Sequence, residues 1–496
     1  MDYKELVFAF NRIGIALSSE THLENLFDLI VDEIIKFSAC DGCSLYIKDD
    51  KKPELIFKAT KTMSLIKKDQ ESVFKSFSVP LKMESIAGYT ALMGDTVNIE
   101  DCYDIAQDKP FIFNRSFDKK TGYRTVSMLS VPMKDNEGNV LGVIQLINKL
   151  EDGGPVPFSK EFEEIILSLA SQAAVAYANA RLLEANKNLY KALVEAFSEA
   201  IEARSPHTAG HSKRVAFISG MIASHINSKK CGYFKDISFS AQKLEELKYA
   251  ALLHDIGKVA VPENVLEKKN KLDDAQIEII KNRFETIKFS IMHNIRDDRL
   301  QKEFVQNIEN DLAFILEKNE PGFCPNEEKA KIMEIGNKKY QDFDGNEHNY
   351  LEDEEVSLLT DFVKGNFSHE EWEKMKKHVL NTLDILATVP FTKELKDIPK
   401  IAGAHHEMLD GSGYPYNVGG KEILIQSRIL AVADVFEALT ALDRPYKKAI
   451  PTEKAVQILG YMAKDGELDS EIVEMFLKDG LYEKYLEARD RGTLDV

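Results

Sequence analysis

Cysteine is scarce in this chain, and long apolar runs are missing. Only five of the 496 residues are cysteines, and the CxxC pair of Cys40 and Cys43 has no second pair with which to form a zinc or cluster site. We therefore expect no disulfide framework and predict a cytoplasmic protein. No stretch of about 18 apolar residues is present, and the N-terminus is amphipathic and acidic, so we predict neither a membrane-spanning helix nor an export signal.

An excess of positive charge is also absent. Lys and Arg number 64 against 82 Asp and Glu, which gives a formal net charge of −18. This balance disfavours binding to a nucleic acid polymer through its phosphate backbone. If the chain acts on a small anionic substrate, a few local cations or metal ions must hold that substrate.

The first part of the chain mixes helical and strand patterns. The chain is too long for a single growing core, so two or more domains are expected. Residues 1–160 contain β-like runs such as "CSLYIKD" and "VLGVIQLIN" between helical patterns, which predicts an α+β domain with an antiparallel sheet flanked by helices. Residues 161–200 predict a connector helix that lacks Gly and Pro. Two copies of the chain are expected to form a homodimer through it; the alternative is a helix that packs only on its own domain.

After residue 200 the strand signal nearly disappears. Residues 201–485 predict an all-α domain, with a polar, charged lobe inserted at about 284–366 and a short tail, 486–496, at the end. The helix after the lobe is expected to begin with a capping box of Ser368 and Glu371.

Six of the eleven histidines fall into compact groups after residue 200. The groups are His207 with His211, His254 beside Asp255, the single His378, and the adjacent His405 and His406. Asp434 follows in the apolar segment "AVADVFEAL", where a buried carboxylate costs several kcal/mol unless it is paired or binds a metal. Imidazole and carboxylate ligands suit Fe, Mn or Zn. A single histidine is more often an ordinary core or surface residue, so the prediction of a shared metal site depends on the whole set.

Five segments, in this order, resemble the HD-GYP family of cyclic dinucleotide phosphodiesterases. They are "ARSPHTAGHSKRV", "LLHDIGKVAVPENVL", "FSHEEWEKMKKHV", "AHHEMLDGSGYP" and "SRILAVADVFEALTALDRPYKKA". The fourth segment distinguishes this family from other HD hydrolases. The resemblance covers residues from about 195 to 485, apart from the lobe, and implies an HD-superfamily fold for the all-α domain.

The resemblance also implies roles for individual residues. His254 and Asp255 would be metal ligands, with the Asp255 carboxylate bridging two metals. His378, His405 and His406 would complete the second metal, and Asp434 the first. His211 would hold a third metal in members that have one, with His207 standing where such members carry Glu. Two or three divalent metals are therefore expected, with Fe or Mn as the metal.

Nearby cations and a loop would complete the site. Lys258, one turn after Asp255, would meet a phosphate oxygen during catalysis, although a solvated surface lysine is the alternative. Arg444, Lys447 and Lys448 would also bind the substrate phosphates. Tyr414 would lie in the loop at the lip of the site and contact the substrate.

The family resemblance implies hydrolysis of cyclic di-GMP to linear pGpG. A second cut, to GMP, is expected where a third metal is bound, and cyclic GMP-AMP is an alternative substrate. Two other hypotheses stay open. The first is a receptor that binds cyclic di-GMP without cutting it. The second is an HD hydrolase of nucleotides such as deoxynucleoside triphosphates, which the loop of Gly413, Tyr414 and Pro415 (the GYP loop) disfavours.

The N-terminal half resembles a GAF domain, most clearly in "SIAGYTALMGDTVNIEDCYD" and "TGYRTVSMLSVPMKDNEGNVLGVIQLINK". GAF domains sense small ligands, so an unidentified small ligand is expected to regulate the phosphodiesterase through the connector helix. Asn148 and Lys149 match part of a motif found in cyclic-nucleotide-binding GAF domains, but Phe162 stands where that motif has Asp.

Overall fold

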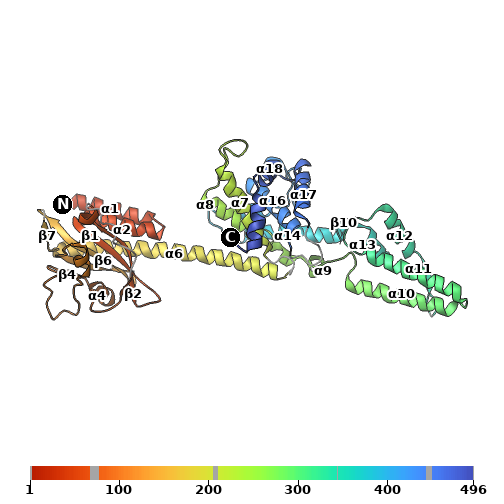
Figure 1. Cartoon of the computed structure of the whole chain (residues 1–496), viewed down its shortest axis with the longest axis horizontal. Coiled ribbons are helices and arrows are strands. Elements are labelled where there is room, and N and C mark those ends of the chain that lie inside the picture. The colour runs from red at the N-terminus through yellow and green to blue at the C-terminus, as the bar shows by residue number, and fades with distance from the viewer. Residues whose placement is uncertain are drawn as a thin grey trace. The chain divides into compact units, whose positions relative to one another are not determined.

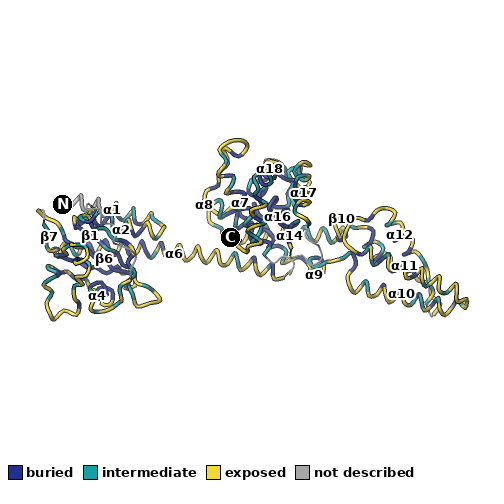
Figure 2. Tube along the Cα trace, viewed as in Figure 1, coloured by how far each residue is buried: buried dark blue, intermediate teal, exposed yellow. Residues whose placement is uncertain are grey.

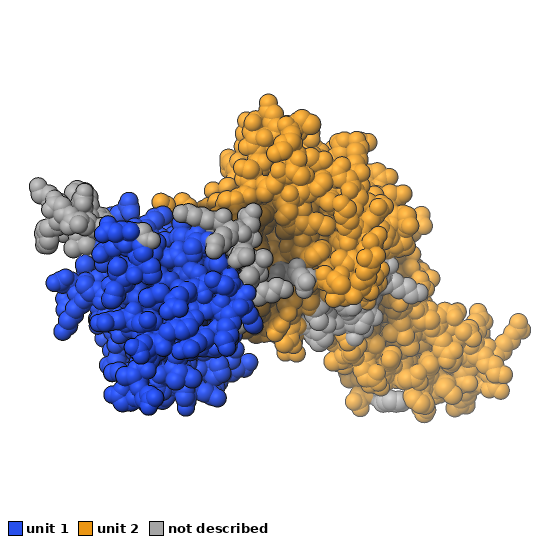
Figure 3. Space-filling view, turned by 60° about the vertical axis from the view of Figure 1, so that its left-hand side comes forward, with its two compact units in different colours: residues 1–190 blue, residues 191–496 orange. Residues whose placement is uncertain are grey.

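The computed structural model describes residues 3–66, 78–152, 154–204, 210–342, 344–442 and 450–494. The chain falls into two compact units, residues 1–190 and 191–496 (Figure 3). Helix α6 (Lys160–Arg204) begins in the first unit and ends in the second, and the predicted connector, 161–200, lies within it. The predicted fold class is confirmed: an α+β domain with an antiparallel sheet is followed by a largely helical domain.

The first unit is built on a seven-stranded antiparallel sheet. Its strand order is β3-β2-β1-β6-β5-β4, and β7 pairs with β6. The strands are β1 (Cys40–Lys48), β2 (Glu54–Thr62), β3 (Ser78–Pro80), β4 (Val97–Ile99), β5 (Met128–Lys134), β6 (Val140–Glu151) and β7 (Gly154–Val156). Of the two central strands, β1 is buried over most of its length and β6 over its middle (Figure 2).

The first unit also contains helices before α6. They are α1 (Tyr3–Ser19), α2 (Leu23–Ser38), α3 (Met63–Ile66), α4 (Ile86–Met93) and α5 (Ser116–Thr121). The main core joins Ile30 of α2 with Leu45 and Ile144 of the sheet and Ala173 of α6. Burial of these apolar side chains is the main force that holds the unit together.

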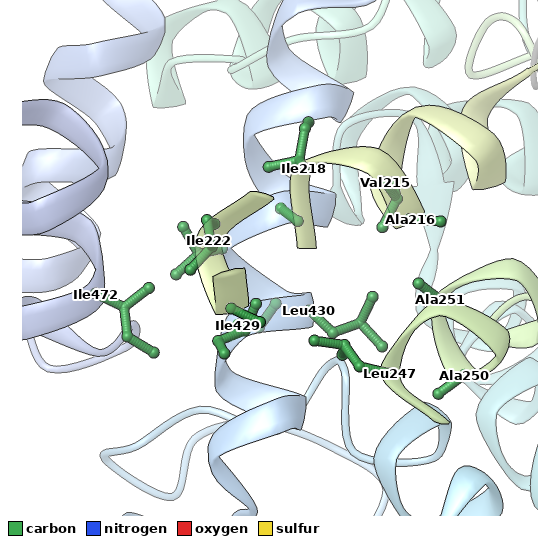
Figure 4. Close-up of a cluster of buried hydrophobic side chains, with 14 of the residues drawn as sticks. Val215, Ala216, Ile218, Ile222, Leu247, Ala250, Ala251, Ile429, Leu430 and Ile472 are labelled. Atoms are coloured by element: carbon green, nitrogen blue, oxygen red, sulfur yellow. The ribbon is translucent and has the colours of Figure 1, made fainter. Parts of the chain in front are cut away.

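The second unit contains a helical bundle around α16 (Ile425–Thr440). The other helices of the bundle are α7 (His211–Ser228), α8 (Ala241–Leu253), α14 (His369–Ala387), α15 (Ile398–Ala402), α17 (Thr452–Lys464), α18 (Ser470–Lys478) and α19 (Leu481–Arg491) (Figure 1). Figure 4 shows Ile222 of α7, Leu247 of α8 and Leu430 of α16 in this core. The predicted C-terminal tail, 486–496, starts inside α19, whose Tyr485 is buried in the same core.

Short elements connect the helices of the bundle, and one of them begins directly after His254 and Asp255 (the HD pair). They are the 3-10 helix η3 (Ile256–Ala260), α9 (Glu263–Leu266) and the 3-10 helix η4 (Gly420–Glu422). Helix α14 begins with the predicted capping box of Ser368 and Glu371. None of the helices in the described part of the chain combines the length and apolar character needed to cross a membrane.

A lobe with its own small core lies between α9 and α14 in the sequence. It consists of α10 (Asp274–Asn294), α11 (Asp298–Lys318), α12 (Asn326–Gly336), α13 (Asp353–Thr360) and the hairpins β8 (Lys339–Gln341) with β9 (Glu347–Asn349) and β10 (Phe362–Lys364) with β11 (Phe367–Ser368). Its core includes Leu272 and Ile280. The core of the lobe therefore includes residues before 284, where the sequence predicted that the lobe starts. The polar composition on which that prediction was based begins only partway along α10.

Candidate metal centre

His254 and Asp255 lie where α8 ends and η3 begins. His254 is the C-cap of α8 and Asp255 is the N-cap of η3. Gly257 permits η3 to approach α14 closely, since a Cβ atom there would lie 1.9 Å from the carbonyl oxygen of His378. Thr382 of α14 strengthens this contact, because its hydroxyl accepts a hydrogen bond from the Gly257 N–H and donates one to the His254 carbonyl. The local sequence "HDIGK" thus brings the HD pair against the helix that carries His378.

The two carboxylate oxygens of Asp255 face different histidines. Oδ1 lies 3.5 Å from Nε2 of His378 and 4.0 Å from Nε2 of His405. Oδ2 lies 3.3 Å from Nε2 of His254 and 3.8 Å from Nε2 of His211. One carboxylate therefore stands between two groups of imidazoles, as a bridging ligand of two metals would.

Three groups of side chains could each hold a metal ion. They are His378, His405 and His406; His211, His254 and Asp434; and His254, Asp255 and His405, with the ligand atoms of each group within 4.8 Å of one another. Among the residues that the structure describes, these groups bring together the predicted ligands from five helices or helix junctions. His378, which is distant from His254 in sequence, lies beside the HD pair.

Three of the histidines present a buried ring nitrogen that has no hydrogen-bond partner among the residues that the structure describes. These atoms are Nε2 of His254, His378 and His405. In each residue Nδ1 bonds to the carbonyl of the residue three positions earlier, at 2.7, 2.7 and 2.6 Å respectively. Because a carbonyl only accepts, Nδ1 carries the proton and Nε2 presents a lone pair to the site. This is the arrangement that a metal-binding histidine requires, so the residues fit a metal centre.

The pKa values of His378, His405 and His406 favour the neutral form. Burial lowers the pKa of His405 to about 3, and it also lowers the pKa of His378. Burial likewise places the pKa of His406 well below its usual range. Neutral imidazole is the form that ligates metals, so no proton has to leave these three residues when a metal binds.

His211 lies among carboxylates. Its Nε2 is 3.2 Å from Asp434 Oδ1, and its Nδ1 bonds to a carboxylate oxygen of Glu437. Burial alone lowers the pKa of His211, but the hydrogen bonds to Asp434 and Glu437 outweigh it and raise the pKa to about 10. The surroundings of this ring therefore attract positive charge, whether it comes from a proton or from a metal ion.

Lys258 is paired and partly buried. Its side chain is 23% exposed, and its Nζ donates to Asp255 Oδ2 at 2.6 Å. Although burial alone raises the pKa of Asp255, the nearby Lys258 and His254 lower it well below its usual range. Asp255 is thus ionised and oriented by a cation from its own 3-10 helix.

The GYP loop contributes an aromatic side chain next to the histidines. The ring of Tyr414 lies 4.8 Å from the ring of His406 and 6.0 Å from the ring of Trp372. Gly413 allows the tight course of the loop, because a Cβ there would lie 2.3 Å from the backbone nitrogen of Met408. Tyr414 therefore lies beside the candidate ligand His406, and its contact with a substrate stays a prediction.

Four predicted site residues lie outside the described residues. They are His207, Arg444, Lys447 and Lys448. The predicted third-metal pair of His207 with His211 and the phosphate contacts of the three cations stay predictions.

Sequence reasoning missed Glu437, which is fully buried one turn after Asp434. One of its oxygens bonds to His211, and the other accepts from Nε of Arg214 at 2.5 Å. The signal was present, because the argument that a buried carboxylate in "AVADVFEAL" needs a partner applies to both acids.

The GAF motif residues have structural partners in the first unit. The Asn148 side-chain oxygen accepts from the backbone N–H groups of Val126 and Ser127, and its amide donates to the Tyr123 hydroxyl and the Arg124 carbonyl. All hydrogen-bonding groups of this side chain are thus used within the domain.

Three domain models match the chain. A GAF domain matches residues 22–177, and two HD domain models match residues 208–318 and 359–472. HD domains are metal-dependent hydrolases, which agrees with the side-chain groups described above.

Curated relatives match over part of their length. The chain is 28% identical over 268 residues to the 3'3'-cGAMP-specific phosphodiesterase 3 of Vibrio cholerae, covering 54% of this chain and 34% of the relative. It is 41% identical over 115 residues to a cyclic di-GMP phosphodiesterase of Thermotoga maritima, covering 23% of this chain and 30% of the relative. In both cases the chain spans about a third of the relative. The matched models show a GAF domain followed by an HD domain, and the relatives support the resemblance of this chain to the HD-GYP family.

Proposed function

We propose that this protein is a metal-dependent phosphodiesterase that hydrolyses cyclic di-GMP to pGpG, with GMP as a further product if a third metal binds. The proposal depends chiefly on one observation: three buried Nε2 atoms, which have no hydrogen-bond partner in the described part of the chain, surround the Asp255 carboxylate. The names of the relatives support hydrolysis of a cyclic dinucleotide. Because they include enzymes for cyclic GMP-AMP and for cyclic di-GMP, cyclic GMP-AMP is the alternative substrate.

The geometry supports the following ligand roles. His211, which the family resemblance assigned to a third metal, lies with His254 and Asp434, so these three would hold one metal and His378, His405 and His406 the other, while Asp255 would contact both. The donors are nitrogen and carboxylate oxygen, which suit Fe or Mn. When bound, the two metals would supply a hydroxide near neutral pH and neutralise charge on the phosphoryl oxygens.

The protein's own side chains then position the substrate. The Lys258 ammonium holds Asp255 at 2.6 Å and has further donors with which to bind a phosphate oxygen. The Tyr414 ring, beside His406, would limit where the substrate enters the site. Arg444 and one of Lys447 and Lys448 would bind the second phosphate.

We further propose a homodimer through α6. Apolar side chains along this helix are between 43% and 62% exposed: Leu182, Leu183, Leu189, Tyr190, Leu193 and Phe197. Leu182 and Leu189 are seven residues apart, as are Leu183, Tyr190 and Phe197, which is the repeat of a coiled coil. Light scattering on the full chain should give twice the mass of 56.1 kDa, and Leu189→Glu should give the monomer mass. A monomeric wild-type chain would refute the dimer.

The activity has a direct test. The full chain, purified without oxygen, is incubated with cyclic di-GMP or cyclic GMP-AMP in the presence of Fe²⁺ or Mn²⁺, and the products are resolved by chromatography. Linear pGpG supports the proposal. Tight binding of cyclic di-GMP without turnover would favour the receptor, and hydrolysis of deoxynucleoside triphosphates alone would favour a different HD hydrolase. Regulation by a small ligand at the GAF domain would appear as a ligand-dependent change in this rate.

A further inference from the structure

The last turn of α6 caps the helix that carries His211. Glu202 is only 7% exposed, and its carboxylate accepts hydrogen bonds from the backbone N–H of Gly210 at 2.6 Å and of Ser212 at 2.7 Å. These two N–H groups flank His211, which is the first residue of α7. The N-cap of α7 is Gly210, which has no side chain that could cap the helix. A carboxylate from another helix thus fixes the backbone on both sides of His211.

Two residues later, Arg204 binds the element that follows Asp255. Its guanidinium donates from Nη1 to the carbonyl of Val259 and from Nη2 to the carbonyl of Val261, the latter at 2.9 Å. Val259 belongs to η3 and Val261 is its C-cap, so Arg204 holds the end of the 3-10 helix that contains Lys258. One planar side chain therefore joins two carbonyls of the same short element.

The two contacts meet at one cavity. Glu202 and Arg204 line it together with His211, Asp255 and Lys258. The end of α6 is thus part of the wall of the metal centre. It contacts two separate elements there, and each element supplies a candidate ligand.

We propose that Glu202 and Arg204 are positioning residues for the metal centre. Glu202 sets the position of His211, and Arg204 sets the position of the Asp255–Lys258 pair, so a displacement of the end of α6 changes the geometry of the metal ligands. The effect on catalysis rests on the proposed function, whereas the effect on metal binding does not. A shift of about 1 Å in a catalytic constellation costs about 100-fold in rate, so this helix is an effective place for control.

The chain offers a matched control one turn earlier on α6. Glu199 also reaches α7, where it pairs with Lys213 at 2.6 Å, but its side chain is 62% exposed and it contacts no backbone group of the site. Glu199→Gln removes a carboxylate from the same helix without touching the flanks of His211. Exposed ion pairs of this kind contribute little.

The test compares Glu202→Gln, Arg204→Lys and Glu199→Gln in the full chain. Gln keeps the shape of Glu202 but has one acceptor oxygen instead of two, so one N–H beside His211 loses its partner. Lys keeps the charge of Arg204, but one ammonium cannot span the two carbonyls. Calorimetry measures the Mn²⁺ affinity of the metal-free protein. An assay with cyclic di-GMP gives kcat and KM, and circular dichroism checks the folding of each variant.

We expect Glu202→Gln to weaken Mn²⁺ binding at one of two sites by about 10-fold or more, the range for groups that orient a ligand. Arg204→Lys should lower kcat by about 10-fold with KM within about twofold of wild type. Glu199→Gln should match wild type in both. If Glu202→Gln does not fold, Glu202→Asp, which keeps both acceptors on a shorter side chain, takes its place.

The outcomes separate the two proposals. The role of Glu202 is overturned if Glu202→Gln binds Mn²⁺ as tightly as the wild type and the control Glu199→Gln do. The role of Arg204 is overturned if Arg204→Lys has the kcat of the wild type. If the wild type cuts no cyclic dinucleotide, the proposed function fails and the role of Arg204 fails with it, whereas the Mn²⁺ affinity of Glu202→Gln, compared with that of Glu199→Gln, still decides the role of Glu202.

Discussion

Both units of this protein bury a cluster of polar side chains, but the two clusters differ in one respect. In the first unit, Asp41 accepts from the Ser64 hydroxyl at 2.6 Å and the Tyr123 hydroxyl at 2.7 Å, and Asn148 donates to Tyr123 at 2.8 Å. These groups satisfy one another. In the second unit, the Nε2 atoms of His254, His378 and His405 lie around Asp255, and no described residue forms a hydrogen bond with them.

This difference indicates which of the two clusters needs a ligand. A buried polar atom without a partner costs about 1–3 kcal/mol, so a protein retains three of them beside one carboxylate only if something else completes their bonding. The Asp41 cluster is complete and holds its fold together. We expect bound metals to complete the Asp255 cluster, and the predictions below test that contrast.

The largest expected effect comes from Asp255→Ala. Loss of the carboxylate that faces both histidine groups should remove bound metal and lower kcat by at least about a thousandfold, because two metals contribute several kcal/mol to such a reaction. Elemental analysis and the cyclic di-GMP assay measure the two effects. Asp384→Ala, an exposed position on α14, is the matched control and should leave both values unchanged. Full activity in Asp255→Ala would refute the site.

Removal of metal should destabilise the second unit alone. Mn²⁺ at 100 times its Kd adds about 2.7 kcal/mol to the free energy of unfolding of the unit that binds it. In calorimetry of the full chain, a chelator should therefore lower the Tm of the transition that belongs to the second unit. The transition of the first unit should stay in place, since its buried polar groups already have partners. Equal shifts of both transitions would contradict the contrast.

Glu437→Gln should have an intermediate effect. The carboxylate joins Nδ1 of His211 to Arg214, and groups that orient a metal-binding histidine typically affect metal affinity or activity by about 10- to 100-fold. We expect the Mn²⁺ affinity of Glu437→Gln to fall by about 10-fold, the low end of that range, because Gln keeps one acceptor oxygen. Glu422→Gln, at an exposed position in η4, provides the control. Mn²⁺ titration distinguishes the two variants, and identical affinities would show that Glu437 does not orient His211.

Tyr123→Phe should have the smallest effect, and only on the first unit. The change removes a donor to Asp41 and an acceptor for Asn148, while Asp41 keeps its bonds to Ser64. The free energy of unfolding of the first unit should fall by about 1 kcal/mol, with Mn²⁺ affinity unchanged. Denaturant unfolding measures this, with the 64% exposed Tyr461→Phe as control. A loss of metal from Tyr123→Phe would break the separation between the clusters.

The sequence predicted the metal centre better than its supports. His254, Asp255, His378, His405, His406 and Asp434 stand in recognisable motifs, and the structure brings them together. Glu202 and Arg204 carry no such signal, because each acts through backbone groups of a different element. Their partners became visible only when the fold placed the end of α6 beside η3 and α7.

The lobe shows a second limit of sequence reasoning. Helices α10 and α14 both begin with a capping box. Ten residues after the N-cap, α14 places His378 beside Asp255, whereas α10 places Arg283 in an ion pair with Glu355 of the lobe, at 2.6 Å. Both helices thus begin in the same way, and tertiary contacts decide which of them reaches the site.

The count of Mn²⁺ ions bound to the metal-free full chain tests the central claim most directly. The ligand groups around Asp255 predict at least two ions per wild-type chain, and none bound with comparable affinity in Asp255→Ala. One ion or fewer per wild-type chain, or the same number in wild type and Asp255→Ala, would contradict a two-metal centre bridged by Asp255.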